Sequence, residues 1–119
     1  MKKNSFLAII PLFSGMHAHS DHLSFQDVYP ILEEKCLACH HNPGAPLGLS
    51  METYNELLKG SQNGVVVIAG DPEKSELIRR IKGEAHPKMP FNGPPYLTEL
   101  EIQLIASWID AGLQNRSHH

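Results

Sequence analysis

The sequence predicts an all-α fold of about four short helices, and three observations lead to that prediction. Apolar residues recur three and four positions apart in several segments, most clearly over residues 102–109. Polar residues that favour helix starts precede these segments, and glycine follows them. The run 65–68 is apolar and β-branched, as a strand would be, but no second strand is evident to pair with it. We therefore expect that run to be extended chain rather than part of a sheet.

The length and charge of the chain limit what it can be. With 119 residues it has enough chain for one small domain. The formal net charge is −3 and no run of Lys and Arg appears. A nucleic-acid-binding surface needs such a basic stripe, so we expect no nucleic-acid partner.

The N-terminus has the pattern of an export signal. Lys2 and Lys3 supply a positive start, and an apolar run over 6–13 follows that is too short to span a bilayer. We expect residues 1–18 to be a signal peptide and residues 19–24 a flexible leader. The mature protein would then be periplasmic or otherwise extracytoplasmic, without stable membrane insertion after the signal is removed.

The first helix is predicted to run from about Asp27 to Cys39. Ser24 and Asp27 have the spacing of a capping box, but a start at Ser24 would place Pro30 in the helix interior. With Asp27 as the N-cap, Pro30 falls in the first turn, where no intrahelical donor is needed. We therefore prefer Asp27 as the N-cap.

Cys36, Cys39 and His40 form the motif Cys-x-x-Cys-His, the attachment signature of a c-type haem. On a helical turn the two thiols lie close enough to form thioethers with the two vinyl groups of the macrocycle. The histidine that follows is then the proximal ligand of the iron. Such a haem would also add buried apolar surface to a core that is marginal at this size.

Three other interpretations of the two cysteines compete with haem attachment: a structural disulfide, half of a zinc site, and a redox dithiol. A structural zinc site needs a second Cys/His pair, and the chain has only two cysteines. A redox Cys-x-x-Cys belongs near a βαβ pattern, which the sequence lacks. Haem attachment is therefore the interpretation that we carry forward.

Two further helices are predicted between the motif and a proline-rich loop. The first covers about Ser50 to Lys59 and is closed by Gly60, with Met51 as a core residue rather than an iron ligand. The second starts with Asp71 as N-cap and Pro72 at its first position, and it ends at Gly83. Before them, Leu47 and Leu49 follow an irregular loop and are expected to pack on the haem.

The long loop 84–96 carries the candidate sixth ligand of the iron. Met89 stands between two prolines, where it has no helical or strand face to fill, and this favours a ligand over a core residue. His86 lies three residues earlier and is chemically competent to bind iron as well. Met89 is the candidate that we prefer, with His86 as its rival.

The last helix has the clearest signals in the chain. Thr98 and Glu101 form a capping box, and Gly112 follows the apolar segment as a C-cap. We expect this helix to pack across the first one and close the domain. Residues 114–119 are predicted to be a disordered tail.

Taken together, these segments resemble the planctomycete-type cytochrome c domain over about residues 25–113. The resemblance implies a cytochrome c-like fold wrapped around one covalently bound haem, with His40 and Met89 as proximal and distal ligands. The chain departs from the family pattern at His41, where glycine is usual, at Met51, where leucine is usual, and at His86. The strings that carry the resemblance are 25–32, 48–51, 57–60, 70–78, 87–90, 97–99 and 108–112.

These features predict an exported monohaem cytochrome c that carries one electron between redox partner proteins and is not an enzyme. A first alternative is a haem sensor or peroxidase-like protein with a displaceable sixth ligand. A second is a metal-handling protein that uses the cysteines and histidines without haem. The sequence identifies neither the redox partners nor the reduction potential.

Overall fold

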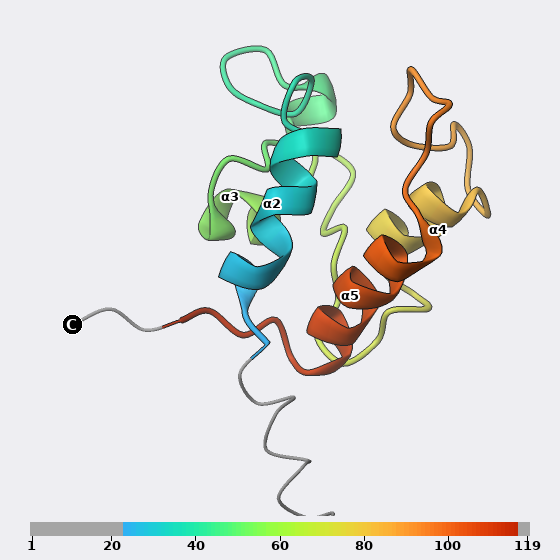
Figure 1. The fold of residues 1–119 in the computed structure, drawn as a ribbon. Coiled ribbons are helices and arrows are strands. Elements are labelled where there is room, and N and C mark those ends of the chain that lie inside the picture. Colours follow the sequence, from blue (N-terminus) through green and yellow to red (C-terminus); the bar gives the residue numbers. More distant parts are fainter. Residues whose placement is uncertain (1–22, 117–119) are drawn as a thin grey trace, which may run out of the picture.

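The computed structural model describes residues 23–116, and over this range it consists of helices joined by turns and loops, without a β-strand (Figure 1). The predicted all-α class is therefore confirmed, and the run 65–68 forms no strand, with a bend at Val66. The predicted signal peptide and residues 19–22 of the predicted leader lie outside the described residues. The helices are α2 (Phe25–Lys35), the 3-10 helix η3 (Pro46–Gly48), α3 (Tyr54–Lys59), α4 (Glu76–Lys82) and α5 (Glu99–Asp110).

Helix α2 begins earlier and ends earlier than we predicted. Ser24 is its N-cap, and the backbone amide of Ser24 donates to the Asp27 carboxylate at 2.8 Å in a capping box. Pro30 lies inside the helix at an exposed position, where the carbonyl that loses its partner can reach water. The last two residues of the predicted leader are also ordered, since Ser24 is buried and Leu23 packs against the core.

Helix α3 starts at Tyr54 rather than at Ser50. The hydroxyl of Thr53 accepts a hydrogen bond from the Glu56 amide at 3.1 Å and caps this helix. Ser50 instead uses its hydroxyl to accept the Glu52 amide at 3.3 Å. A serine that binds a nearby amide in this way favours a turn over a helix, so the helix begins after it.

Helix α4 also starts later than predicted, with Ser75 rather than Asp71 as N-cap. Asp71 accepts the Lys74 amide at 3.2 Å and forms a separate turn before the helix. The buried hydroxyl of Ser75 accepts the Ile68 amide at 2.8 Å and donates to the Asp71 carbonyl at 2.9 Å. This hydroxyl therefore joins the segment 65–68 to the start of α4. Gly83 ends α4 in the left-handed conformation, as predicted.

Helix α5 has the predicted capping box of Thr98 and Glu101, with Ala111 as the C-cap and Gly112 one position beyond it. It packs against both α2 and α4, so the predicted contact between the first and last helices is confirmed. Trp108 is completely buried at this crossing, and its ring centroid lies 6.0 Å from that of Phe25. The most deeply buried apolar side chains are Val28, Leu32, Leu57, Ile81, Ile105, Trp108 and Ile109.

Residues 114–116, which we predicted to be part of a disordered tail, instead lie against the N-terminus of α2. The carbonyl of Gln114 accepts hydrogen bonds from the Phe25 amide at 2.8 Å and from the indole of Trp108 at 2.9 Å. Arg116 forms an exposed ion pair with Asp27 at 3.4 Å. This segment thus satisfies donors of α2 and α5 that the sequence pattern did not assign. Residues 117–119 lie outside the described residues.

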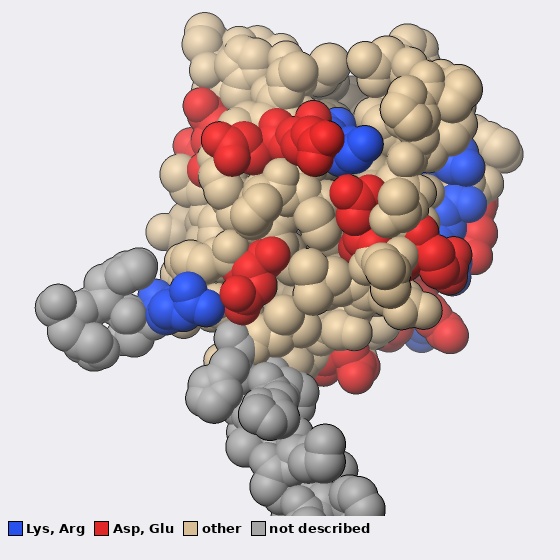
Figure 2. Space-filling model, in the orientation of Figure 1, with Lys and Arg blue, Asp and Glu red and all other residues tan. Residues whose placement is uncertain are grey.

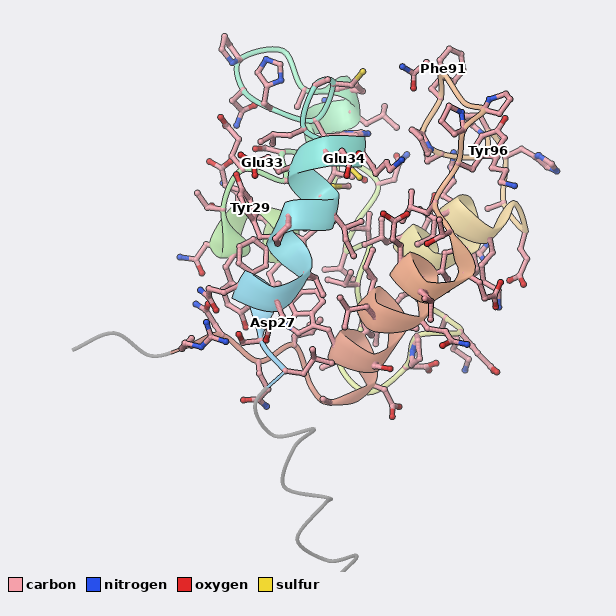
Figure 3. The ribbon with its side chains drawn as sticks, in the orientation of Figure 1. Asp27, Tyr29, Glu33, Glu34, Phe91 and Tyr96 are labelled. Carbon is pink, nitrogen blue, oxygen red and sulfur yellow. The ribbon has the colours of Figure 1, made fainter. Side chains whose placement is uncertain are left out.

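Two loops stand at the same end of the molecule, one at 41–49 and the other at 83–97 (Figure 1). In the space-filling view a notch separates them at the upper edge, and acidic side chains lie at the end of α2 nearest to it (Figure 2). Glu33 and Glu34 lie on this outer face of α2, while Phe91 stands at the tip of the second loop (Figure 3). None of the helices in the described range is both long and apolar enough to cross a bilayer.

Candidate functional site

The Cys-x-x-Cys-His motif follows α2 directly and forms a hydrogen-bonded turn. The amide of His40 donates to the Cys36 carbonyl at 2.9 Å, and the amide of Cys39 donates to the same carbonyl at 3.2 Å. The two thiols are not joined in a disulfide; that of Cys36 is half-buried and that of Cys39 is exposed. The turn therefore brings three of the predicted site residues together on one short segment.

The environment of Cys36 differs from that of a reactive thiol. Burial, and to a smaller extent the neighbouring Cys39, raises the pKa of the Cys36 thiol to about 11. Redox-active and metal-binding cysteines need the thiolate, which positive neighbours usually stabilise. Within residues 23–116 no group of three or more His, Cys, Asp and Glu side chains converges as a metal site requires. The surroundings of Cys36 therefore favour neither a redox dithiol nor a zinc site.

The imidazole of His40 is oriented by a backbone carbonyl. Its Nδ1 atom lies 3.0 Å from the carbonyl oxygen of Leu49. Because a carbonyl can only accept, Nδ1 is the donor of this pair, which leaves Nε2 as the nitrogen of the neutral imidazole that could bind a metal. The Met51 amide also donates to the His40 carbonyl at 2.8 Å. Segment 49–51 therefore holds His40 through both ring and backbone, as outer partners of metal-binding histidines do.

The loop that carries Leu49 is supported by the turn 60–64. The Gln62 amide donates to the Leu47 carbonyl at 2.7 Å, and Leu47 adopts a positive φ of 51° in η3. Gly60, at a φ of 83°, packs so closely on this turn that a Cβ atom would lie 2.4 Å from the Gly64 carbonyl oxygen. Leu49 is buried, whereas the side chain of Leu47 is 55% exposed.

His41 is exposed, and its ring also caps the end of the motif turn. Its Nδ1 atom lies 2.7 Å from the Leu37 carbonyl oxygen, although the residue as a whole is exposed. This hydrogen bond satisfies a carbonyl that the end of the turn leaves without an intrahelical partner. The histidine that stands where the family usually has glycine thus has a structural contact of its own.

Met89 and its rival His86 lie on the second loop in different surroundings. Met89 is half-buried and packs against the same apolar core as Cys36 and Leu37. Its amide donates to the Arg80 carbonyl at 3.0 Å, which connects this part of the loop to α4. His86 is exposed. Of the two candidate ligands, Met89 is therefore the one directed toward the interior.

The tip of this loop is ordered by a contact between Lys88 and Tyr96. The ammonium group of Lys88 lies 4.1 Å from the centroid of the Tyr96 ring, which is within the range of a cation–π interaction. Gly93 lies against the same ring, and a Cβ atom there would be only 2.4 Å from a ring carbon. Tyr96 therefore fixes both limbs of the loop on either side of Met89.

The donors at this end of the molecule fit a c-type haem. The motif turn supplies two unpaired thiols and an imidazole nitrogen with a free lone pair, and the facing loop supplies a thioether. Thiols for covalent attachment and an imidazole with a thioether for iron are the groups that such a haem uses. Cys36, Cys39 and His40 would hold the haem, and the loop 83–97, which carries Met89, stands at the same end of the molecule (Figure 1).

Two contacts of the site were not found by sequence reasoning. The Leu49 carbonyl orients His40, and α4 holds the Met89 loop through Arg80. A backbone carbonyl has no residue signature, so nothing in the sequence could have indicated Leu49 for this role. Arg80 has no sequence signal for this role, because its contact depends on the tertiary position of the loop.

Comparison with known proteins gives one match. Residues 36–93 match the family model described as Planctomycete cytochrome C, from the first cysteine of the motif to a point four residues beyond Met89. The search of curated proteins and the search of solved structures returned no match. The matched segment leaves out α2 and α5, which pack against each other and complete the apolar core.

Proposed function

Because the chain carries a planctomycete-type cytochrome c domain, we propose that it is an exported one-electron carrier with a single haem c and His40/Met89 ligation. A domain of this family implies a covalently bound haem c. The carrier role, the number of haems and the two axial ligands are our inference from the residues of the site. Redox partner proteins of unidentified type would deliver and accept the electron.

The observation that carries this proposal is the orientation of His40. Its Nδ1 atom is engaged by the Leu49 carbonyl at 3.0 Å, which leaves Nε2 as the only ring nitrogen able to bind iron. The motif turn places the two thiols directly before this histidine. A histidine held in this tautomer beside two cysteines matches the proximal side of a c-type haem.

Each residue of the site has a role that follows from its position. Cys36 and Cys39 would anchor the haem covalently, His40 would occupy one axial position, and Met89 the other. When bound, haem c supplies reversible one-electron chemistry. A methionine retained in both oxidation states leaves no open position for a substrate and keeps the ligand geometry similar in the two states. This arrangement suits a carrier rather than an enzyme.

Export and the domain boundaries are further parts of the proposal. The positive and apolar N-terminal pattern supports removal of residues 1–18, and cytochrome c domains are usually exported. We place the folded unit at residues 25–113 with its attached C-terminal segment, because α2 and α5 complete the core around the matched family segment. The mature protein would then act in the periplasm or another extracytoplasmic compartment.

The sixth ligand is tested by comparing the visible spectra of exported wild-type, Met89→Ala and His86→Ala proteins. We expect Met89→Ala to lose the methionine–ferric iron charge-transfer band and to have a lower reduction potential, because the thioether raises the potential. His86→Ala is the matched control and should retain both properties, since His86 is exposed. Loss of the band in His86→Ala alone would reverse the assignment.

Ligand exclusion separates the carrier from a sensor or peroxidase-like protein. A ferrous wild-type protein with Met89 on the iron should bind carbon monoxide slowly at neutral pH, because the methionine must first leave. Rapid binding by the wild type would contradict the carrier function and support a displaceable sixth ligand. Protein produced with haem-attachment machinery but without haem absorbance would instead support the metal-handling alternative.

A further inference from the structure

Arg80 lies in the last turn of α4 and contacts the Met89 loop in two ways. Its backbone carbonyl accepts the Met89 amide at 3.0 Å. Its guanidinium nitrogen Nη1 donates to the Pro87 carbonyl at 3.4 Å. Backbone atoms two residues apart in the loop are thus held by one residue of the helix.

Glu76 fixes the guanidinium in the orientation that this contact needs. The Nε and Nη2 atoms of Arg80 lie 3.0 Å and 2.7 Å from one carboxylate oxygen of Glu76, one helical turn earlier. The Arg80 side chain is only 25% exposed, so solvent screens the pair less than at a fully exposed site. Arginine can make these contacts at the same time because its planar group carries five donors in a fixed fork.

We propose that Arg80 is a positioning residue for the sixth iron ligand, an inference that rests on the proposed role of Met89. Pro87 and Met89 lie on either side of Lys88. Because both are hydrogen-bonded to Arg80, the peptide between them has a fixed orientation relative to α4. The Met89 side chain is then directed toward the core that it contacts. Without Arg80 the Met89 amide would keep its backbone partner, but the Pro87 carbonyl would lose its side-chain donor.

The neighbouring Arg79 provides a matched control. It is half-buried in the same helical turn, and its carbonyl accepts the amides of Glu84 and Ala85 at 2.7 Å and 3.0 Å. These backbone contacts survive substitution of the side chain. Arg79→Gln therefore removes the same charge at the adjacent position without removing the donor to Pro87, and it separates the loss of charge from the loss of that contact.

The test uses the haem-loaded full-length protein and measures the affinity of its ferric form for added imidazole, which competes with methionine for the iron. We expect Arg80→Gln to bind imidazole about tenfold more tightly than wild type, since a hydrogen bond from a charged group contributes about that factor. Arg79→Gln should match wild type. Arg80→Lys should fall between them, because an ammonium group cannot reach Glu76 and Pro87 in the same fixed geometry.

Three outcomes decide the inference. Equal imidazole affinity in Arg80→Gln and Arg79→Gln, with the methionine band present in wild type, would overturn the positioning role and leave the proposed function intact. A wild type without that band would overturn the Met89 assignment and this inference together. If Arg80→Gln yields no folded protein, Glu76→Gln replaces it, and the inference then requires imidazole affinity above that of Arg79→Gln with an unchanged urea midpoint.

Discussion

The two sides of the proposed haem site are built in different ways. On the proximal side, His40 lies in a contiguous five-residue motif, and the backbone of segments 49–51 and 60–64 supports it. On the distal side, Met89 lies in the loop 83–97 between α4 and α5, whose shape depends on side chains of Arg80, Lys88 and Tyr96.

This difference indicates which property each side controls. Backbone contacts and tight glycine turns cannot be removed without displacing the chain, so changes on the proximal side should lower the stability of the whole domain. Side-chain contacts in the distal loop can be removed one at a time. Changes there should alter the binding of the sixth ligand while the rest of the fold remains.

The largest effect is expected at Gly60, on the proximal side. An alanine there would place its Cβ atom 2.4 Å from the Gly64 carbonyl oxygen and 2.7 Å from the Val65 Cα atom, at a φ of 83°. We expect Gly60→Ala to lower the free energy of unfolding by about 3 kcal/mol or more, since backbone strain and a backbone clash add. Urea denaturation of the haem-loaded protein measures this change.

Gly64→Ala is the matched control for this clash. Gly64 also has a positive φ, at 121°, but a Cβ atom there would meet no neighbouring heavy atom within 4 Å. Its cost should be limited to backbone strain, about 1 kcal/mol. Equal losses in the two variants would show that the close packing of the turn 60–64 does not support the proximal loop.

Sequence reasoning succeeded where the signal was local. The α5 capping box of Thr98 and Glu101 is complete within a few residues, and it was predicted in the correct place. The starts of α3 and α4 were predicted too early because Ser50 and Asp71 favour helix starts and turns equally. Which of the two forms depends on neighbours such as Glu52 and Lys74, whose amides they bind.

Contacts that depend on tertiary structure were beyond the sequence pattern. We preferred Asp27 as the first N-cap because proline is unfavourable in a helix interior. The structure starts the helix earlier, where Ser24 forms a capping box with Asp27 and Phe25 is buried against Trp108. The ordered segment 114–116 had no periodicity to indicate it, because its contacts are made by its backbone carbonyls and polar side chains with α2.

A smaller effect is expected at Lys88, on the distal side. Lys88→Gln removes the cation–π contact with Tyr96, which contributes about 0.5–1 kcal/mol to the order of the loop. We expect a two- to fivefold rise in the affinity of the ferric protein for imidazole, as about 1.4 kcal/mol corresponds to tenfold, with an unchanged urea midpoint. Titration followed at the methionine charge-transfer band measures the affinity.

Lys82→Gln is the control for the change of charge in this experiment. Lys82 pairs with Glu84 at 3.4 Å, but the two side chains are 46% and 56% exposed, so the pair should contribute little. Its imidazole affinity should equal that of wild type. A lower urea midpoint in Lys88→Gln without a change in imidazole affinity would contradict the division between a stabilising proximal side and a ligand-controlling distal side.

The smallest effect is expected at Asp27, which belongs to neither side of the site. The Ser24 backbone amide, with smaller contributions from the Ser24 hydroxyl and Arg116, holds the pKa of Asp27 below its usual value of 3.8. A lowered pKa in the folded state stabilises the fold above about pH 4, and this contribution is lost as the pH falls through the folded-state pKa. Asp27 is exposed, so Asp27→Asn should cost only about 0.3 kcal/mol at neutral pH. Urea denaturation at pH 7 and pH 3 should show this difference at pH 7 and a smaller one at pH 3.

Imidazole affinity should not change in Asp27→Asn, because the capping box of α2 supports the scaffold under both sides equally. An altered affinity would mean that α2 transmits changes to the distal loop through α5, and the two sides would then not be separable.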